Sequence, residues 1–164
     1  FAHLDLWGTI MMLTIGFGWA KPVPINPNNF KNRKLGMALT ALAGPVSNLI
    51  MAYVAMIVYK LIYFHAPYSD IMVNLFYMFG YIVSLNVGLA VFNLLPIPPL
   101  DGSRVFSIFL KEDTYFNIMR YEQIIFLVLI VVMNVGILDT PIAKLQNVTL
   151  DVMDILTGFL GRLY

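Results

Sequence analysis

The chain has 164 residues, of which 60% are hydrophobic and 12% are charged, and its mean hydropathy is +0.80. Soluble domains contain about 25% charged residues, so this composition excludes a soluble globular domain and indicates an integral membrane protein. The net charge of +1 says nothing about nucleic acid, but no basic patch alternates with aromatic residues as a strand-binding groove would need, so no nucleic-acid partner is expected. The absence of cysteine excludes a disulfide framework, a thiolate metal site and a cysteine nucleophile.

The N-terminal part of the sequence combines a short apolar stretch with a proline-rich loop. Residues 6–19 are apolar but too few for a spanning helix, which needs about 20 residues. Prolines restrict an extended run to the edge of a sheet, so we predict a short extended or β segment near residues 18–27. Such an edge can pair with an extended peptide through its backbone. The candidate substrate-binding residues are Pro22, Val23, Pro24, Ile25 and Asn26, although an ordinary loop is the other interpretation.

The remainder of the chain predicts helices. Residues 35–64 and 71–95 are two strong spanning segments, and residues 124–138 form a shorter apolar segment after a charged connection. Residues 140–164 predict an amphipathic helix that could lie on the membrane surface. Its apolar stripe consists of Leu145, Val148, Val152, Ile155, Leu156 and Phe159. The expected fold is an all-α polytopic helix bundle that forms one membrane-embedded domain over residues 1–164.

Most of the cations lie at the ends of the two strong spans that are expected on one side of the membrane. They precede the first span and follow the second, at Lys21, Lys31, Arg33, Lys34, Arg104, Lys111 and Arg120. Because cytoplasmic loops carry an excess of Lys and Arg, both basic segments are expected in the cytoplasm. The turn at residues 65–70 is then expected on the opposite side of the membrane.

A proline-rich run at residues 93–101 breaks the second span. Prolines 96, 98 and 99 remove backbone donors and force extended dihedrals, so the preceding helix must end near Asn93. Asp101 can start a new helix, whose positive end favours an ionised carboxylate. Lipid offers no partner to freed backbone groups or charges, so such a break must be buried in protein or line a wet cavity. An ionisable residue there is a candidate functional residue, and Asp101 suits a metal ligand near the cytoplasmic face.

Each of these polar residues also has a purely structural interpretation. Asp101 could simply begin a helix at the membrane exit, and Asn93 could hydrogen-bond between helices. An amide before the break could instead donate to a developing oxyanion, which is worth roughly 3 kcal/mol in known hydrolases. Gly44 and Pro45 fit a tight helix crossing. Asn48 fits either such a crossing or a role in orienting a site.

Taken together, four segments resemble the site-2 protease family of intramembrane zinc metalloproteases. The segments are residues 3–9, 18–26, 43–48 and 93–102, in the family's order. The resemblance is closest to small prokaryotic members without a PDZ or CBS domain. It implies a zinc-dependent endopeptidase that cleaves transmembrane substrate helices in the prokaryotic cell membrane, with membrane lipid and a transmembrane protein or peptide as partners. By resemblance, Asp101 is a zinc ligand, Asn93 stabilises the oxyanion, and Gly44, Pro45 and Asn48 orient the site.

One departure from the family pattern is important. The family's HExxH motif, which supplies two zinc ligands and the general base, is absent from this sequence. We interpret the chain as an N-terminally truncated protease domain and expect it, by itself, to be inactive and to lack catalytic zinc. The alternative is a non-enzymatic bundle, transporter-like or scaffold-like, that uses the broken helix at Asp101 for passage of an ion or solute.

Overall fold

A computed structural model describes residues 9–10, 13–14, 26 and 29–162 of the chain. The chain divides into two compact units, Phe1–Arg33 and Lys34–Tyr164. In the first unit, the Thr14 hydroxyl donates to the Ile10 carbonyl (2.9 Å). The second unit contains the long helices, the first of which begins one residue earlier, at Arg33.

Two helices are long and apolar enough to cross a membrane: α2 (Arg33–His65) and α3 (Asp70–Asn93). At a rise of 1.5 Å per residue, they measure about 50 Å and about 36 Å, against a hydrocarbon core of about 30 Å. The Ser69 side chain accepts a hydrogen bond from the Met72 backbone N–H (3.3 Å) and thereby caps α3. These helices confirm the two predicted spans, and the chain is an integral membrane protein.

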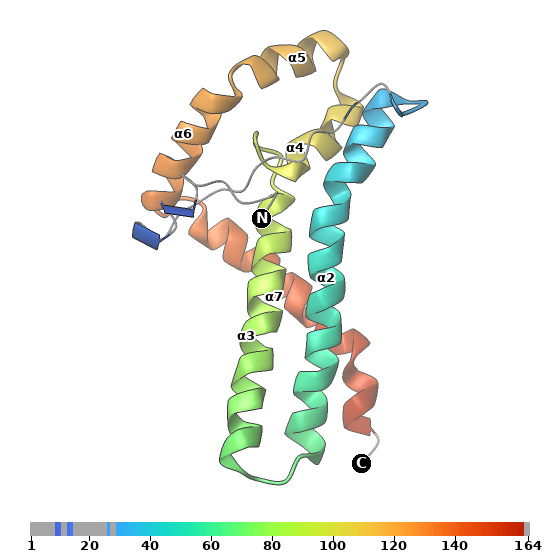
Figure 1. Ribbon diagram of the computed structural model, residues 1–164, viewed down its shortest axis with the longest axis vertical. Helices are drawn as coiled ribbons and strands as arrows, with labels where there is room; N and C mark the ends of the chain where they lie inside the picture. The colour runs from blue at the N-terminus through green and yellow to red at the C-terminus, as the bar shows by residue number, and fades with distance from the viewer. Residues whose placement is uncertain (1–8, 11–12, 15–25, 27–28, 163–164) are drawn as a thin grey trace. The chain divides into compact units, whose positions relative to one another are not determined.

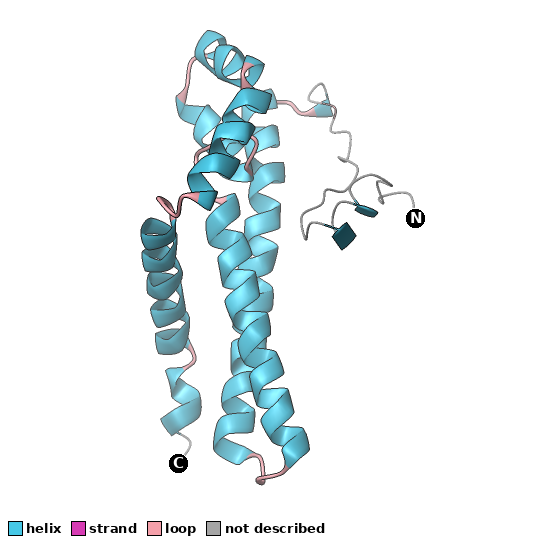
Figure 2. Ribbon diagram, turned by 90° about the vertical axis from the view of Figure 1, so that its left-hand side faces the viewer, coloured by secondary structure: helices cyan, strands magenta, loops and turns pink. Residues whose placement is uncertain are grey.

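The helices α2 and α3 lie side by side and antiparallel (Figures 1 and 2). Their core combines two alanines and a methionine of α2 with three valines of α3, namely Ala52, Ala55, Met56, Val83, Val87 and Val91. Apolar side chains therefore fill the space between the two helices. The pairing brings the start of α2 and the end of α3 to the same end of the unit.

The third long helix, α7 (Asp139–Leu156), packs against α3 and reaches the same core through Met153. Figure 2 shows it running beside the α2–α3 pair. The helix ends earlier than the predicted residue 164, so Phe159 of the predicted apolar stripe lies beyond α7. The stripe is exposed, whereas Ile142, Leu150 and Met153 face the core. An ion pair between Lys60 and Asp154 (2.7 Å) joins α7 to α2. Besides the predicted stripe, α7 therefore has a second apolar face, which packs on the core and was not predicted.

Short helices connect α3 to α7. They are α4 (Asp101–Phe106), the 3-10 helix η2 (Ser107–Phe109), α5 (Glu112–Arg120) and α6 (Glu122–Asn134), and a final 3-10 helix, η3 (Gly158–Arg162), follows α7. The axes of α5 and α6 are bent by 62° at Tyr121 (Figure 1). The predicted third apolar segment is therefore realised as α6, and it makes a third span only if α5 and α6 count together.

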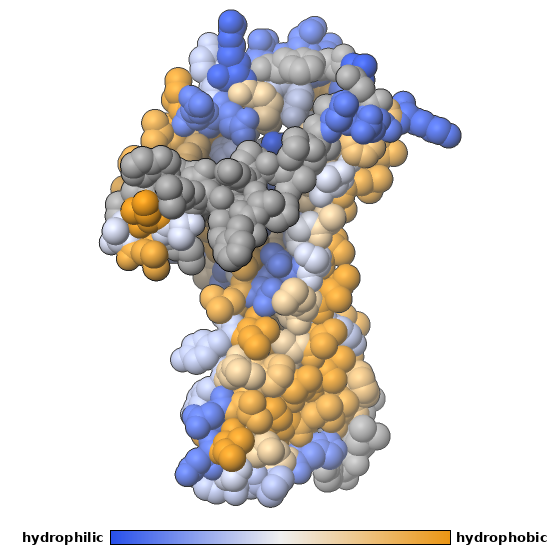
Figure 3. Space-filling view, viewed as in Figure 1, coloured by the Kyte–Doolittle hydropathy of each residue, from blue (hydrophilic) through white to orange (hydrophobic). Residues whose placement is uncertain are grey.

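The surface agrees with a membrane-spanning pair. In Figure 3, hydrophobic side chains cover much of the lower half of α2 and α3, and hydrophilic side chains gather at both ends. Exposed apolar residues on the two spans include Ile50, Val54, Leu85 and Leu89. Such side chains are suited to contact with lipid.

The topology can be tested with single cysteines, because the chain contains none of its own. Tyr68 in the α2–α3 turn is 91% exposed, and Phe109 after the helix break is 83% exposed. From the positive-inside bias, we expect a membrane-impermeant maleimide applied at the cytoplasmic side to label Phe109→Cys and to spare Tyr68→Cys. The opposite labelling pattern would contradict this orientation.

Candidate functional site

The proline-rich run forms a turn structure between two helices, as predicted. The helix α3 ends at Asn93 with Leu94 as its C-cap, and α4 begins at Asp101. Within the break, the Leu95 N–H donates to Phe92 O (3.1 Å) and the Leu100 N–H donates to Ile97 O (2.9 Å). These bonds satisfy backbone groups that lipid could not satisfy. The break is therefore a built element that fixes where Asp101 lies after α3.

Gly102 marks a close approach between the two sides of the break. A Cβ atom at this position would overlap with the carbonyl oxygens of Leu94 and Leu95. Leu94 is the C-cap of α3 and Leu95 follows it, so the start of α4 lies directly against the residues that end the preceding helix. Only glycine permits this approach. The sequence marked Gly102 as part of a motif, but the backbone contact that requires it was not predictable from spacing.

Asp101 lies beside Gly44 of α2, more than fifty positions earlier in the sequence. An added Cβ on Gly44 would lie 3.2 Å from Asp101 Oδ2, which is tighter than an ordinary van der Waals contact. Pro45 next to it is fully buried inside α2. Two segments singled out from the sequence, residues 43–48 and 93–102, therefore meet at the Asp101 carboxylate. Gly44 leaves the space that this carboxylate occupies.

The Asp101 carboxyl is half-buried and lies outside both spanning helices. Burial raises its pKa above the ordinary value, and the positive charge of Arg104 lowers the pKa in part. The sequence suggested an ionised carboxylate because Asp101 begins a helix. Burial works against ionisation when no cation is bound, since desolvation disfavours the charged form. A nearby cation would shift the balance toward the carboxylate.

The remaining predicted site residues have different positions. Asn93 is the last residue of α3 and is half-buried. Asn48 is half-buried on α2, one helical turn after Gly44, so the two residues lie on the same face. Asn26 has no regular structure, and its carbonyl accepts a hydrogen bond from the Asn29 N–H (3.1 Å). Residues 22–25, and with them the expected extended segment, lie outside the described residues.

The described residues fit one ligand of a zinc site and not a complete site. A catalytic zinc takes three protein ligands and a water molecule. Within the part of the chain that the structure describes, no group of three His, Cys, Asp or Glu side chains could hold a metal ion. Asp101 is the carboxylate that the break and α2 position, and it could supply one oxygen ligand to a metal ion.

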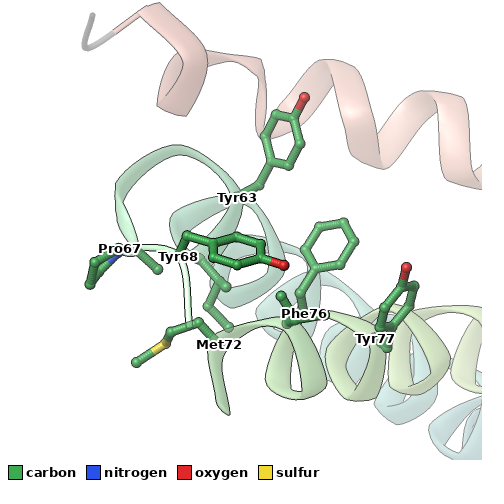
Figure 4. A pocket seen from close by; sticks show the side chains of 9 residues that line it. Tyr63, Pro67, Tyr68, Met72, Phe76 and Tyr77 are labelled. Atoms are coloured by element: carbon green, nitrogen blue, oxygen red, sulfur yellow. The ribbon is translucent and has the colours of Figure 1, made fainter. Parts of the chain in front are cut away.

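A hollow lies at the end of the α2–α3 pair that is opposite to Asp101. It has a volume of about 430 Å³ and is lined by aromatic and apolar side chains around the turn, including Tyr63, Tyr68, Phe76 and Tyr77 (Figure 4). Tyr59 stacks on Phe76 nearby, with ring centroids 4.3 Å apart. Tyrosines gather at membrane–water interfaces because their rings are amphipathic. This hollow is therefore suited to the membrane boundary and is separate from Asp101.

Comparison with known proteins supports the resemblance to the site-2 protease family independently. Residues 61–136, which include the whole break, match Peptidase family M50. Over 136 residues the chain is 40% identical to a protein of Bacillus subtilis (strain 168) named "Putative zinc metalloprotease YwhC". The alignment covers 79% of this chain and 61% of that relative, so the chain spans only part of the relative's length. No solved structure matches the chain. These two matches confirm the resemblance of the chain to the site-2 proteases, peptidase family M50.

Proposed function

We propose that this chain is part of an intramembrane zinc metalloprotease that cleaves transmembrane substrate helices, in a prokaryotic cell membrane and near its cytoplasmic face. The contact between Gly44 and Asp101 is the observation that carries the proposal, because it joins two separate family-like segments at one carboxylate. The similarity to peptidase family M50 and the two spanning helices support it.

The proposed roles follow from position and chemistry. Asp101 supplies one oxygen ligand to zinc, and Gly44, Pro45 and Asn48 keep that carboxylate in place from α2. The Asn93 side-chain amide, at the end of α3, donates a hydrogen bond to the oxyanion that forms when the scissile carbonyl is attacked. The segment from Pro22 to Asn26 holds the substrate in an extended conformation through backbone hydrogen bonds. The two further zinc ligands and the general base belong to an HExxH segment of the full-length protein.

The role of Asn93 gives the direct test. Full-length protein should contain stoichiometric zinc, and Asn93→Ala should keep that zinc. Cleavage of a transmembrane substrate should then lose roughly 2–4 kcal/mol of transition-state stabilisation, as other oxyanion donors do. Zinc analysis and single-turnover cleavage in proteoliposomes measure the two quantities separately.

A matched control lies on the same helix. Asn86 is a half-buried asparagine of α3 whose side chain donates to the Ile82 carbonyl (2.8 Å), and Asn86→Ala should leave cleavage unchanged. Absence of zinc from the full-length protein would contradict the protease proposal. Equal cleavage by Asn93→Ala and the parent would contradict the oxyanion role alone.

A further inference from the structure

A lysine at the start of α2 contacts the segment that carries Asp101. The Lys34 ammonium donates a hydrogen bond to the Leu110 carbonyl (2.9 Å), across a separation of 76 residues. Leu110 caps the C-terminal end of η2, which follows α4 directly. The contact therefore joins the first turn of α2 to the far end of the α4–η2 segment.

Lys34 stands where a cation is locally unfavourable. The first turn of α2 begins with Arg33 and Lys34 and contains no acidic residue. A helix N-terminus carries a partial positive charge, so cations there are destabilising. Arg33 is exposed to surrounding solvent, but Lys34 is half-buried. The hydrogen bond to the Leu110 carbonyl offsets the destabilisation that a cation causes at this helix end.

The face of α2 that carries Lys34 also points inward. Ala38, Ala41 and Pro45 follow Lys34 at helical spacing, and all three are buried. Lys34 therefore lies on the same inward face of α2 as Ala38, Ala41 and Pro45. In the α4–η2 segment, Gly102 is buried against the Leu94 and Leu95 carbonyls, and Ser103 and Ser107 are buried as well.

The start of α2, from Lys34 to Gly44, and the α4–η2 segment have similar lengths. From Lys34 to Gly44, α2 rises about 15 Å, at 1.5 Å per residue. The six residues of α4 and the three of η2 together rise about 15 Å, since 3-10 turns rise about 2 Å per residue. Asp101 meets Gly44 at one end, and Leu110 meets Lys34 at the other. The α4–η2 segment is therefore held antiparallel to the start of α2 at both of its ends.

We infer that Lys34 is a positioning residue, which fixes the α4–η2 segment against α2 and so holds Asp101 beside Gly44. The effect of Lys34 on zinc rests on the proposed function, in which Asp101 is a zinc ligand. The structural part, that Lys34 fixes the segment, stands without zinc or proteolysis. The two parts can be tested separately.

Cysteine accessibility tests the structural part. Ser107 is buried in the segment, and Ser107→Cys is a small change in a chain that has no other cysteine. In this background, Lys34→Met should raise the rate of alkylation by a small maleimide about tenfold, since a hydrogen bond to a charged group contributes about that factor. Lys34→Arg keeps a cationic donor and should retain most of the protection. Equal protection in Lys34→Met and the parent would overturn the inference.

Two controls separate local release from other effects. Arg33→Met removes a cation from the same helical turn and should leave Ser107→Cys protected. If Arg33→Met exposed Ser107→Cys as much as Lys34→Met does, the cause would be charge at the helix end, and the inference would be overturned. Ala55→Cys reports on the α2–α3 core, where Ala55 is 4% exposed. It should stay protected in every variant, and its exposure in Lys34→Met would show general unfolding and equally overturn the inference.

The functional part is tested in the full-length protein. Lys34→Met should weaken zinc binding about tenfold in a competition titration with a chelator, with Lys34→Arg close to the parent and Arg33→Met unchanged. Unchanged zinc affinity in Lys34→Met would show that Lys34 fixes the segment without acting on the site. Should the parent bind no zinc, the proposed function fails, and the accessibility result still decides whether Lys34 holds the segment.

Discussion

Replacement of Asp101 by alanine in the full-length protein is expected to abolish zinc binding and substrate cleavage together. A catalytic zinc has three protein ligands, so loss of one leaves a site that holds the ion poorly and in the wrong geometry. The half-buried carboxylate beside Gly44 is the described group in position to act as that ligand. Zinc content after gel filtration and cleavage in proteoliposomes should both fall to background.

The control for this substitution is Asp70→Ala. Asp70 is the first residue of α3, just as Asp101 is the first residue of α4, so both carboxylates face the positive end of a helix. Loss of such a helix-end charge costs only about 0.3–1 kcal/mol of stability. We therefore expect Asp70→Ala to keep zinc and activity. Full activity of Asp101→Ala would instead support the reading of Asp101 as an ordinary helix start.

Gly102→Ala is expected to destabilise the protein severely. Its Cβ would overlap with the Leu94 and Leu95 carbonyl oxygens, which are backbone atoms and cannot rotate away. Overpacking of this kind typically costs about 1–3 kcal/mol, and more where the neighbour is rigid. We expect a loss at the upper end of that range or beyond. Unfolding in mixed micelles with increasing SDS measures it, and zinc binding should fall as well because Asp101 is displaced.

Two other glycines provide the comparison. Gly158, at the start of η3, has no atom within 4 Å of an added Cβ, so Gly158→Ala should be neutral or stabilising by about 0.4–1 kcal/mol. Gly44→Ala would press against the movable Asp101 carboxylate, at 3.2 Å, and should cost little stability while weakening zinc binding. A Gly102→Ala protein as stable as Gly158→Ala would contradict the close approach at the break.

The sequence alone determined the membrane class, the two spans and the position of the break. Long apolar runs leave few alternatives in a bilayer, where every backbone group must be satisfied within a helix. Prolines 96, 98 and 99 end a helix through their own geometry, so the end of α3 at Asn93 and the start of α4 at Asp101 were local consequences. The positions of Asn93 and Asp101 on the two sides of the break were predictable for the same reason.

Only the tertiary structure decided which distant residues meet. Gly44 lies beside Asp101, and Lys34 contacts Leu110, because α2 and α3 are antiparallel and the chain turns back after the break. Neither contact follows from residue spacing, since each joins segments that are more than fifty positions apart. The helix α7 shows the same limit: its exposed stripe was predicted, but the face that packs on α3 was not. A helix with apolar residues on two faces does not specify its neighbour, and the choice depends on which surface of the assembled bundle it can fill.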